Sequence, residues 1–291
     1  MRRAVVTAGT GGIGLETAKG LARAGYAVTV VGRDAERGAR AVEKIGEPAR
    51  FLRADLASLS DVRALAEKIA AEGELAVLVN NVGAMFENRT DFDGVEASFV
   101  VNHLSPYLLT ELLLPVLRTG APSRVVNVTS GAAVLAKKVF DQVEPPGGYY
   151  GFHWYGRAKL ANQAYALDLA QRLEGSGVSV FAADPGGANT TMTKDSLRNP
   201  KIVSPALRLL WPLVRRRFKQ LDSKTAETAA RSSIIAATDE ALAGKTGLLI
   251  DDHGAPAAPM KAATDPLVVA AVRRLSERHA PLSHVPDQIS N

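Results

Sequence analysis

A tyrosine and a lysine four residues apart are the first indication of chemistry. Tyr155 and Lys159 stand in WYGRAKLANQAYALDLAQRL, residues 154–173, whose apolar spacing predicts a helix. Side chains four residues apart share one face of a helix. A free tyrosine has a pKa of about 10, but a neighbouring ammonium favours its charged form. The pair could therefore exchange a proton with an alcohol or a carbonyl group.

A hydroxyl stands ahead of this pair. Ser130 is the last residue of RVVNVTS, a stretch that predicts a buried strand followed by a turn. At the carboxyl end of a strand, this hydroxyl could hold a substrate oxygen. The Tyr-x-x-x-Lys spacing alone is weak, since such spacings arise by chance, but it occurs once in this chain.

The stretch VVTAGTGGIG, residues 5–14, predicts a nucleotide site because it ends a strand and begins a helix. Glycines there let the backbone approach a pyrophosphate, and the helix N-terminus supplies free N–H groups. Two glycine patterns overlap. One uses Gly9, Gly11 and Gly14; the other starts at Thr7, uses Gly12 and Gly14, and meets an alanine where its first glycine is expected.

The end of the second predicted strand indicates which dinucleotide would bind. NAD-binding sheets usually carry an acidic residue there for the ribose 2′-hydroxyl. Here the strand AVTVVGRD ends in Gly32 and Arg33. A guanidinium suits a 2′-phosphate, so the sequence favours NADP over NAD. The alternative is a surface arginine in an ordinary loop. The next residue, Asp34, is expected to cap a helix.

These residues need a scaffold that brings strand ends together. Valine-rich runs predict seven strands covered on both faces: 4–7, 27–31, 50–54, 76–80, 124–128, 178–182 and 248–251. Amphipathic stretches predict helices near 13–24, 35–45, 59–72, 94–117, 155–174 and 224–238, with a last helix from Asp265. Ser58 with Asp61 resembles a capping box.

The alternation of strand and helix predicts an α/β fold. We expect a single-domain, Rossmann-type, doubly wound parallel sheet of about seven strands with helices on both faces. The domain covers residues 1–280, and residues 281–291 are expected to form a frayed tail. Ligands of such sheets bind at the carboxyl ends of the strands, where strand order reverses.

Composition removes several classes of function. The 291 residues include no cysteine, which excludes disulfides and thiolate chemistry and suits the cytoplasm. The net charge of +5 is dispersed, so no nucleic-acid partner is expected. No stretch reaches the roughly 18 apolar residues of a membrane span, and the N-terminus lacks a signal-peptide pattern. His153 and the 251–253 stretch lack companions at ligand spacing, so no metal is expected.

Taken together, these motifs resemble the short-chain dehydrogenase/reductase family over essentially the whole chain. The resemblance rests on the turn from Thr7 to Gly14, on NNVG at 80–83 and on DPGGANTTM at 184–192. It implies a catalytic tetrad of Asn102, Ser130, Tyr155 and Lys159. It also implies a nicotinamide cofactor, which Arg33 at the end of the second strand makes NADP(H) rather than NAD(H). The residues expected to hold it are Thr7, Gly9, Thr10, Gly12, Ile13, Gly14, Arg33, Asp55, Leu56, Asn81, Gly83, Tyr155, Lys159, Pro185, Gly186 and Thr190.

Within the family, the chain is similar to the retinol dehydrogenase and protochlorophyllide reductase branch. The long gap between Ser130 and Tyr155, the stretch VNHLSPYLLT and the stretch KLAN carry this similarity. The resemblance implies that Lys159 lowers the pKa of Tyr155 and holds the ribose, and that Ser130 orients the substrate oxygen. It implies further that Asn102 acts through its main-chain carbonyl and a water molecule.

Three residues depart from the family pattern. Ala8 replaces the first glycine of the turn; we expect a negative φ there, with Gly9 taking any unusual backbone angle and the pyrophosphate over Gly12 and Ile13. Pro106 has no N–H for the carbonyl of Asn102, so it could keep that carbonyl free, or it could be an incidental kink. Gly11 stands where relatives often have a polar or basic side chain, which leaves more of the recognition of NADP to Arg33, helped by Arg37 or Arg53.

The substrate side is expected between residues 191 and 225, which would form a lid. The stretch PALRLLWPLVRRRFKQL at 205–221 is apolar and basic. Three interpretations stay open: a lid over a bulky hydrophobic substrate, a membrane-surface contact, and a helix packed on the core. The aromatic stretch at 145–155 is either a pocket wall or a satellite core. The candidate substrate residues are Trp154, Met192, Leu210 and Trp211, and Leu207, Leu213 and Val214 are further lid candidates.

The sequence therefore predicts an NADP-dependent oxidoreductase that transfers a hydride between nicotinamide and a hydrophobic alcohol or carbonyl substrate. Two alternatives remain: a non-redox enzyme that uses Tyr155 as an acid or base, and a non-catalytic NADP-binding sensor. A homodimer or homotetramer is compatible with the resemblance, since many relatives pair through the helices near 94–117 and 155–174.

Overall fold

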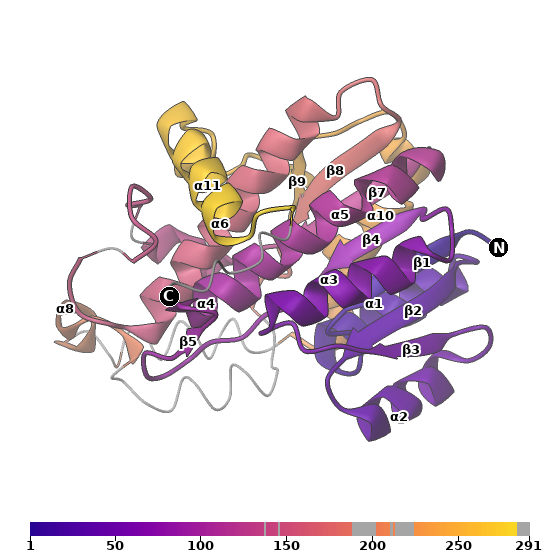
Figure 1. Cartoon of the computed structure of the whole chain (residues 1–291), viewed down its shortest axis with the longest axis horizontal. Coiled ribbons are helices and arrows are strands. Elements are labelled where there is room, and N and C mark those ends of the chain that lie inside the picture. The colour runs from indigo at the N-terminus through magenta and orange to yellow at the C-terminus, as the bar shows by residue number, and fades with distance from the viewer. Residues whose placement is uncertain (137, 145, 188–201, 210–211, 213–223, 284–291) are drawn as a thin grey trace, which may run out of the picture.

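The structure is a computed structural model that describes residues 1–136, 138–144, 146–187, 202–209, 212 and 224–283 (Figure 1). Thr190, Met192, Leu210 and Trp211 lie outside the described residues, as do Leu213, Val214 and most of the expected lid. The C-terminal stretch 284–291 is outside them as well.

The seven predicted strands and one further strand, β10, form a single sheet in the order β10-β9-β8-β7-β4-β1-β2-β3, and all of them except β10 are labelled in Figure 1. Its strands are β1 (Arg3–Thr7), β2 (Ala27–Gly32), β3 (Arg50–Arg53), β4 (Val77–Asn80), β7 (Ser123–Val128), β8 (Val178–Ala183), β9 (Leu248–Ile250) and β10 (Pro256–Ala257). The first seven are parallel, as predicted. The sequence prediction missed β10, a two-residue strand that pairs antiparallel with β9. A separate hairpin joins β5 (Asp91–Phe92) and β6 (Val95–Glu96).

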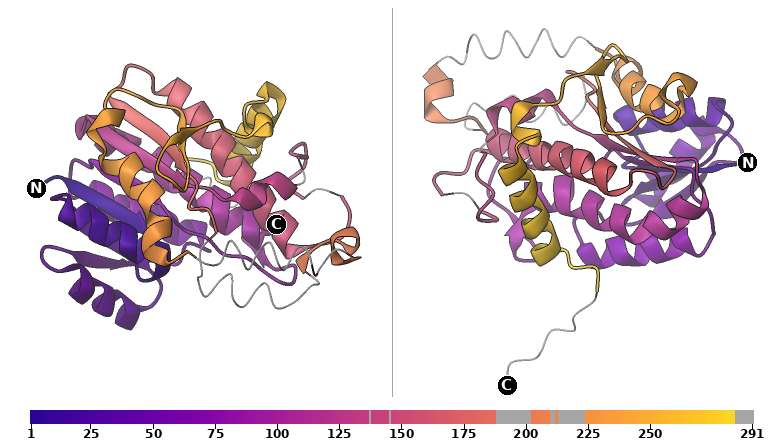
Figure 2. Two further views of the ribbon diagram at one scale, coloured as in Figure 1. Left: turned by 180° about the vertical axis from the view of Figure 1, so that it is seen from behind. Right: turned by 90° about the horizontal axis from the view of Figure 1, so that it is seen from above.

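Helices cover both faces of the sheet (Figures 1 and 2). One face carries α1 (Gly12–Arg23), α2 (Ala35–Ile45) and α10 (Ala226–Thr238). The other carries α3 (Leu59–Ala70), α5 (Ser105–Thr119) and α6 (Gly151–Arg172), with α11 (Pro266–His279) lying against α6. The expectation of a doubly wound sheet with helices on both faces is confirmed.

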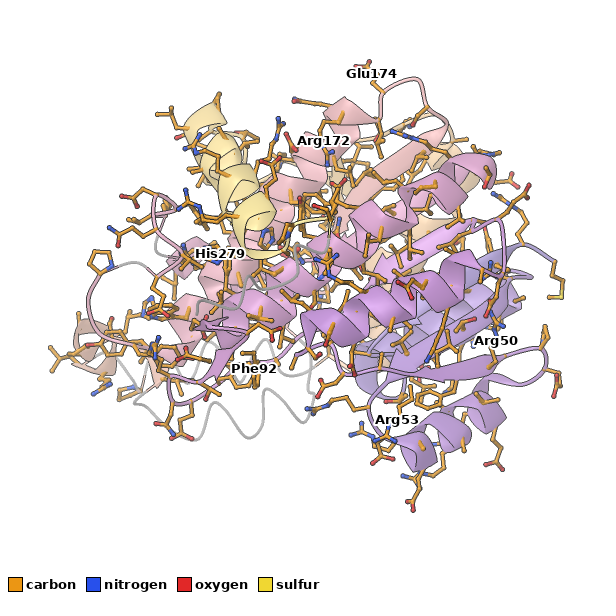
Figure 3. The ribbon with its side chains drawn as sticks, viewed as in Figure 1. Arg50, Arg53, Phe92, Arg172, Glu174 and His279 are labelled. Atoms are coloured by element: carbon orange, nitrogen blue, oxygen red, sulfur yellow. The ribbon has the colours of Figure 1, made fainter. Side chains whose placement is uncertain are left out.

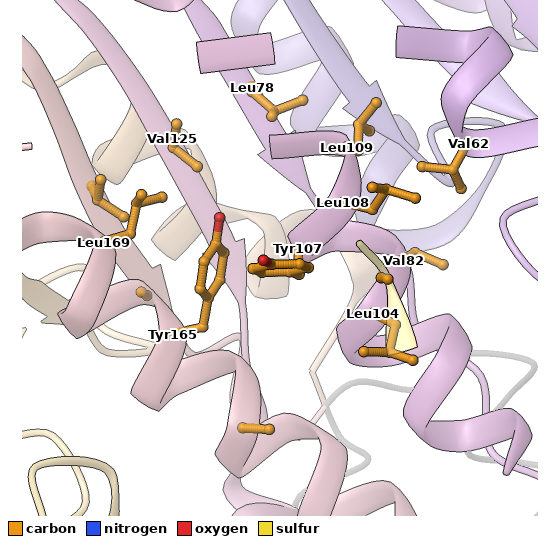
Figure 4. Close-up of a cluster of buried hydrophobic side chains, with 14 of the residues drawn as sticks. Val62, Leu78, Val82, Leu104, Tyr107, Leu108, Leu109, Val125, Tyr165 and Leu169 are labelled. Carbon is orange, nitrogen blue, oxygen red and sulfur yellow. The ribbon is translucent and has the colours of Figure 1, made fainter. Parts of the chain in front are cut away.

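Two apolar cores fill the space between these layers. The larger lies between the sheet and α3, α5 and α6, and the smaller lies on the opposite face. Figure 4 shows part of the larger core, where the rings of Tyr107 and Tyr165 meet edge to face at 5.2 Å. The valine runs are continuous in the central strands, which are covered on both faces, and the four residues of β4 are all buried.

Side chains that begin the helices behave largely as predicted. Asp34 accepts a hydrogen bond from the Arg37 N–H, and Asp265 caps α11. Ser58 accepts from the Asp61 N–H, which is one half of a capping box. The other half is missing, because the Ser58 N–H donates to the carbonyl of Asp55 instead.

The predicted helix at 94–117 is divided. A short helix α4 (Ala97–Phe99) leads into a π-helical turn over Val100–Leu104, and α5 follows. Within the described residues, the segment Ala97–Thr119 is the one helix long and apolar enough to cross a membrane, and 78% of its most apolar window is buried inside the protein. These residues pack mainly against the core of the domain.

Candidate active site

Three of the four predicted catalytic residues converge on one glycine. A Cβ atom placed on Gly83, just after β4, would lie 3.9 Å from each of Asn102 Oδ1, Lys159 Nζ and Tyr155 Oη. Gly83 follows β4, Asn102 lies in the π-helical turn, and the other two residues share one face of α6. All three side chains are buried, with at most 6% of their surface exposed. Tyr155 and Lys159, predicted from their spacing, and Asn102, predicted from the family resemblance, therefore lie close together in the fold.

Ser130 completes the cluster at the end of β7. A hydrogen bond between Ser130 and Tyr155 lowers the pKa of the tyrosine, but burial dominates and raises that pKa to about 12. The charge of Asp184 raises it further. In the protein alone, Tyr155 is therefore a neutral phenol, which is the form that can donate a proton.

Burial also controls the charge of Lys159. Its Nζ donates to the main-chain oxygens of Val82, at 2.9 Å, and Val128, at 3.0 Å. Burial lowers the pKa of Lys159 to about 7. In the protein alone, the pKa of Tyr155 is set by burial, by the hydrogen bond with Ser130 and by the charge of Asp184. An effect of Lys159 on that pKa thus stays a proposal for the complex with cofactor.

The side chain of Asn102 is fully engaged. Its Oδ1 accepts from the Ala84 N–H at 2.9 Å, and its Nδ2 donates to the carbonyls of Ala84 and Ser98, both at 2.8 Å. These bonds tie the π-helical turn to the segment after β4. What Asn102 can still offer a relay is its main-chain carbonyl, and Pro106 has no N–H to donate to it.

The expectation of a negative φ at Ala8 is wrong: its φ is +50°. Gly9 does not take the unusual angle in its place. A side chain on Gly9 would lie 2.8 Å from Val30 Cγ1, so Gly9 is needed for close packing against β2. Gly12, with φ +53°, and Gly14, whose Cβ would meet the Ala8 oxygen at 2.4 Å, fit the register that starts at Thr7.

Two predicted cofactor residues, Thr7 and Asn81, support this turn through hydrogen bonds to each other. The Thr7 hydroxyl accepts from the N–H of Asn81, at 2.9 Å, and from that of Val82, at 3.2 Å. The side-chain amide of Asn81 donates from Nδ2 to the main-chain oxygen of Thr7 at 3.1 Å. Together they lock the end of β1 to the end of β4, where strand order reverses. Ligands of doubly wound sheets bind at this point.

Arginines gather at the carboxyl end of β2. Arg33, Arg37 and Arg53 are exposed, and Arg53 Nε donates to the Arg33 oxygen at 3.0 Å beside α2 (Figure 3). A Cβ on Gly11 would lie 2.9 Å from Arg37 Nη2, so the guanidinium of Arg37 lies over the glycine turn. Gly32 packs against Thr10, whose Cγ2 would lie 2.8 Å from a Cβ there.

The remaining described cofactor candidates line the same edge of the sheet. Asp55 Oδ1 accepts from the Ala57 N–H at 3.0 Å, and Leu56 is buried with its oxygen bonded to Ser105. Pro185 and Gly186 follow β8, and Gly186 has a φ of +66°. Ile13 lies in the first turn of α1.

Asp184 is a site residue that the sequence prediction missed. Its main-chain N–H donates to the main-chain oxygen of Ile250 at 2.8 Å, and its Oδ1 accepts from the Gly186 N–H at 2.9 Å. Burial raises the pKa of Asp184, and its charge acts on Tyr155. The available signal was a carboxylate at the end of a strand, directly before a Pro-Gly pair.

The aromatic stretch before Tyr155 is packed inward. Trp154 is 4% exposed, and its ring lies 5.2 Å from that of Tyr149. Phe152 forms a small cluster with Ile202 and Val203. This packing agrees with the satellite-core interpretation of the stretch. His153 joins two segments: its Nδ1 lies 2.9 Å from the Leu135 oxygen, and its Nε2 accepts from the Ser204 N–H.

The fold and the site define a dinucleotide-binding enzyme class, and sequence comparison gives the family. The profile of the short chain dehydrogenase family matches residues 2–201. The chain belongs to this family.

Within the family, the chain is related to the retinol dehydrogenases. It is 37% identical to retinol dehydrogenase 12 of Mus musculus over 250 residues, which cover 83% of this chain and 75% of that protein. An uncharacterised Mycobacterium paratuberculosis protein has a similar structure, with a TM-score of 0.76, 27% identity and coverage of 96% of this chain and 93% of that one. The RhlG/NADP active-site complex of Pseudomonas aeruginosa has a TM-score of 0.67 and 28% identity, covering 86% of this chain and 94% of that one.

Proposed function

We propose that this oxidoreductase uses NADP(H) and transfers a hydride between nicotinamide and a hydrophobic alcohol or carbonyl substrate. The observation that carries the proposal is the convergence of Asn102, Tyr155 and Lys159 on Gly83. This cluster lies at the edge of the sheet where the glycine turn begins. A proton-transfer group and a dinucleotide turn at one edge are what coupled hydride and proton transfer requires.

Each residue of the cluster has a distinct task. The bound nicotinamide supplies or accepts the hydride. Ser130 holds the substrate oxygen, and Tyr155 gives that oxygen a proton during reduction or takes one during oxidation. Lys159 would hold the cofactor ribose and return a proton toward Tyr155, and the Asn102 carbonyl would hold the water of the relay. Thr190, outside the described residues, stays a candidate for contact with the nicotinamide carboxamide.

The preference for NADP rests on the arginines at the end of β2. Arg33 and Arg37 are exposed and free of acidic side chains at salt-bridge distance among the described residues. We expect Arg33→Ala and Arg37→Ala each to raise the Kd for NADPH about tenfold or more, because each removes a charge-assisted hydrogen bond to the 2′-phosphate. The Kd for NADH should not change.

Titration of NADPH fluorescence measures these constants. Arg40→Ala is the matched control, because Arg40 lies one turn further along α2 and pairs with Glu36. Equal affinity of the wild type for NADPH and NADH would overturn the preference.

The hydrophobic substrate is inferred from the surface near the site. Val134, Leu135 and Val139 after Ser130, and Leu209 in α8 (Pro205–Leu209), are large apolar side chains that are 39–85% exposed. Similarity to retinol dehydrogenases agrees with an apolar substrate. The absence of cysteine supports a cytoplasmic location. A homodimer or homotetramer stays a proposal; its surface would have to accommodate α11, which packs on α6.

A panel of aldehydes and ketones tests the activity. The purified protein should consume NADPH, followed by absorbance, with at least one apolar carbonyl compound. Tyr155→Phe should abolish this turnover, whereas Tyr26→Phe, far from the strand ends that carry the site, should retain it. If the wild type consumes NADPH with no member of the panel, the non-redox or sensor alternative is favoured.

A further inference from the structure

A buried arginine on the catalytic helix holds the segment that follows Ser130. Arg157 is 1% exposed. Its guanidinium donates to three main-chain oxygens, those of Val139 at 3.0 Å, Gln142 at 2.8 Å and Val143 at 2.9 Å. All three acceptors belong to the segment between Ser130 and α6, which we call the 131–150 segment. One side chain therefore binds three main-chain carbonyls of a bend in the loop.

Two aromatic rings enclose the same guanidinium. Its Cζ lies 4.8 Å from the ring centroid of Phe99 and 4.6 Å from that of Phe140. Phe99 belongs to α4, and Phe140, which is 3% exposed, belongs to the 131–150 segment. Burial lowers the pKa of Arg157 to about 10, so the group keeps its charge at neutral pH. Cation–π contacts are strongest when the cation is desolvated in this way.

The far end of the 131–150 segment is anchored as well. Tyr149 Oη lies 3.0 Å from the Phe86 oxygen and 3.2 Å from Glu96 Oε1, so its proton has an acceptor in either direction. The buried Glu96 accepts from the N–H groups of Ser98 and Phe99. Glu96 also provides a negative charge near Arg157.

The position of Arg157 on α6 connects this anchoring to catalysis. Arg157 is two residues from Tyr155 and two from Lys159, so it lies on the opposite side of a helix that turns about 100° per residue. One face of α6 carries Tyr155 and Lys159, and the opposite face carries Arg157, which binds the 131–150 segment. The exposed apolar side chains Val134, Leu135 and Val139 lie on that loop, after Ser130.

We propose that Arg157 is a positioning residue that fixes the 131–150 segment to α6 as the substrate-side wall of the active site. Its loss would release the wall without disturbing the glycine turn after β1, which supplies none of the partners of Arg157. The enzyme would then take bulky apolar carbonyl compounds poorly, while small ones would still react. This inference rests on the proposed function, and the experiment below separates the two.

The test uses Arg157→Met, which keeps the apolar stem and removes the donors. Hydrogen exchange followed by mass spectrometry should show peptides from 138–144 exchanging about tenfold faster or more, with peptides of α1 unchanged. The KM for decanal should rise about tenfold or more, while kcat with propanal and the Kd for NADPH stay near wild type. Arg172→Met is the control, because Arg172 lies on the same helix and pairs with Glu111 near the surface.

A second variant covers the case in which Arg157→Met does not fold. Phe140→Leu removes one ring of the sandwich from the loop side and should produce the same pattern more weakly. Unchanged exchange of 138–144 in both variants overturns the anchoring. A KM that rises equally for decanal and propanal overturns the role in the substrate wall. If neither aldehyde reacts with the wild type, the proposed function fails, and the exchange measurement still decides whether Arg157 anchors the loop.

Discussion

At the residue scale, Ala8 is a non-glycine residue that adopts an unfavourable, left-handed backbone conformation. The turn after β1 needs a left-handed residue at position 8. The neighbouring glycine cannot replace it, since Gly9 packs too closely on Val30. An L-residue in this region costs about 1–2 kcal/mol. The glycine-rich turn after β1 therefore stores strain at position 8.

Replacing this alanine should relieve the strain. We expect Ala8→Gly to raise the free energy of unfolding by about 1 kcal/mol, the relief of the left-handed angle being partly offset by the greater freedom of glycine in the unfolded chain. Ala22→Gly, within α1, should lower it by about 0.5–1 kcal/mol. Denaturant titration of both variants and the wild type measures whether each substitution raises or lowers the free energy of unfolding. Destabilisation by Ala8→Gly would show that the angle carries no strain.

Lys159 gives a prediction on pH. Its pKa is about 7 in the folded protein against an ordinary value of 10.5. Between these values the unfolded chain binds more protons than the folded one, so this group makes stability rise with pH. The free energy of unfolding of the wild type, minus that of Lys159→Met, should grow from about pH 7 to about pH 10 by at most about 1.4 kcal/mol per unit. Parallel pH curves for the two proteins would show that burial does not shift this lysine.

At the element scale, the π-helical turn contains Asn102 and is followed directly by the first turn of α5, which contains Pro106. The Ser105 N–H donates to the Val100 oxygen, five residues back. Pro106 then stands in the first turn of α5 without an N–H. Both features interrupt the ordinary pairing of the helix at the residue whose carbonyl the relay would use. Such π-helical turns are frequent at functional sites.

Restoring the N–H should close this opening. In Pro106→Ala, the residue at 106 can donate to the Asn102 carbonyl, so we expect kcat to fall about tenfold or more with the Kd for NADPH unchanged. Pro115 lies inside the same helix but further from the cluster, and Pro115→Ala should leave kcat as it is. Steady-state kinetics with equal kcat in all three proteins would make Pro106 an incidental kink.

At the scale of the whole molecule, the sequence predicted the features that depend on local pattern. The valine runs gave the seven parallel strands, and Asp34 and Asp265 gave two helix starts. Features that depend on contacts distant in sequence were not predictable. Gly9 packs against Val30 of the neighbouring strand, which the sequence does not reveal. The helix α6 begins at Gly151 rather than near 155, and an added Cβ at Gly151 would lie 2.1 Å from the Phe86 oxygen.

The same division applies to the site. Tyr155 and Lys159 were found by spacing, because one helix sets their geometry. Arg157 stands between them in sequence, yet its partners at 139–143 come from an irregular loop that no periodicity describes. Asp184 follows β8, and its charge acts on Tyr155 because α6 packs against that strand. Tertiary contacts of this kind require the folded structure.

The most direct test of the central claim follows one atom. The reaction is run with each of the two C4 diastereomers of NADPH that carry one deuterium at C4. The diastereomer whose deuterium is transferred should give an alcohol product with one deuterium on the former carbonyl carbon. Mass spectrometry of the product from the wild type measures this, and Tyr155→Phe should form no such product. Deuterium on the carbinol carbon, lost in Tyr155→Phe, is the predicted result; a product formed without deuterium from either diastereomer would contradict hydride transfer at this site.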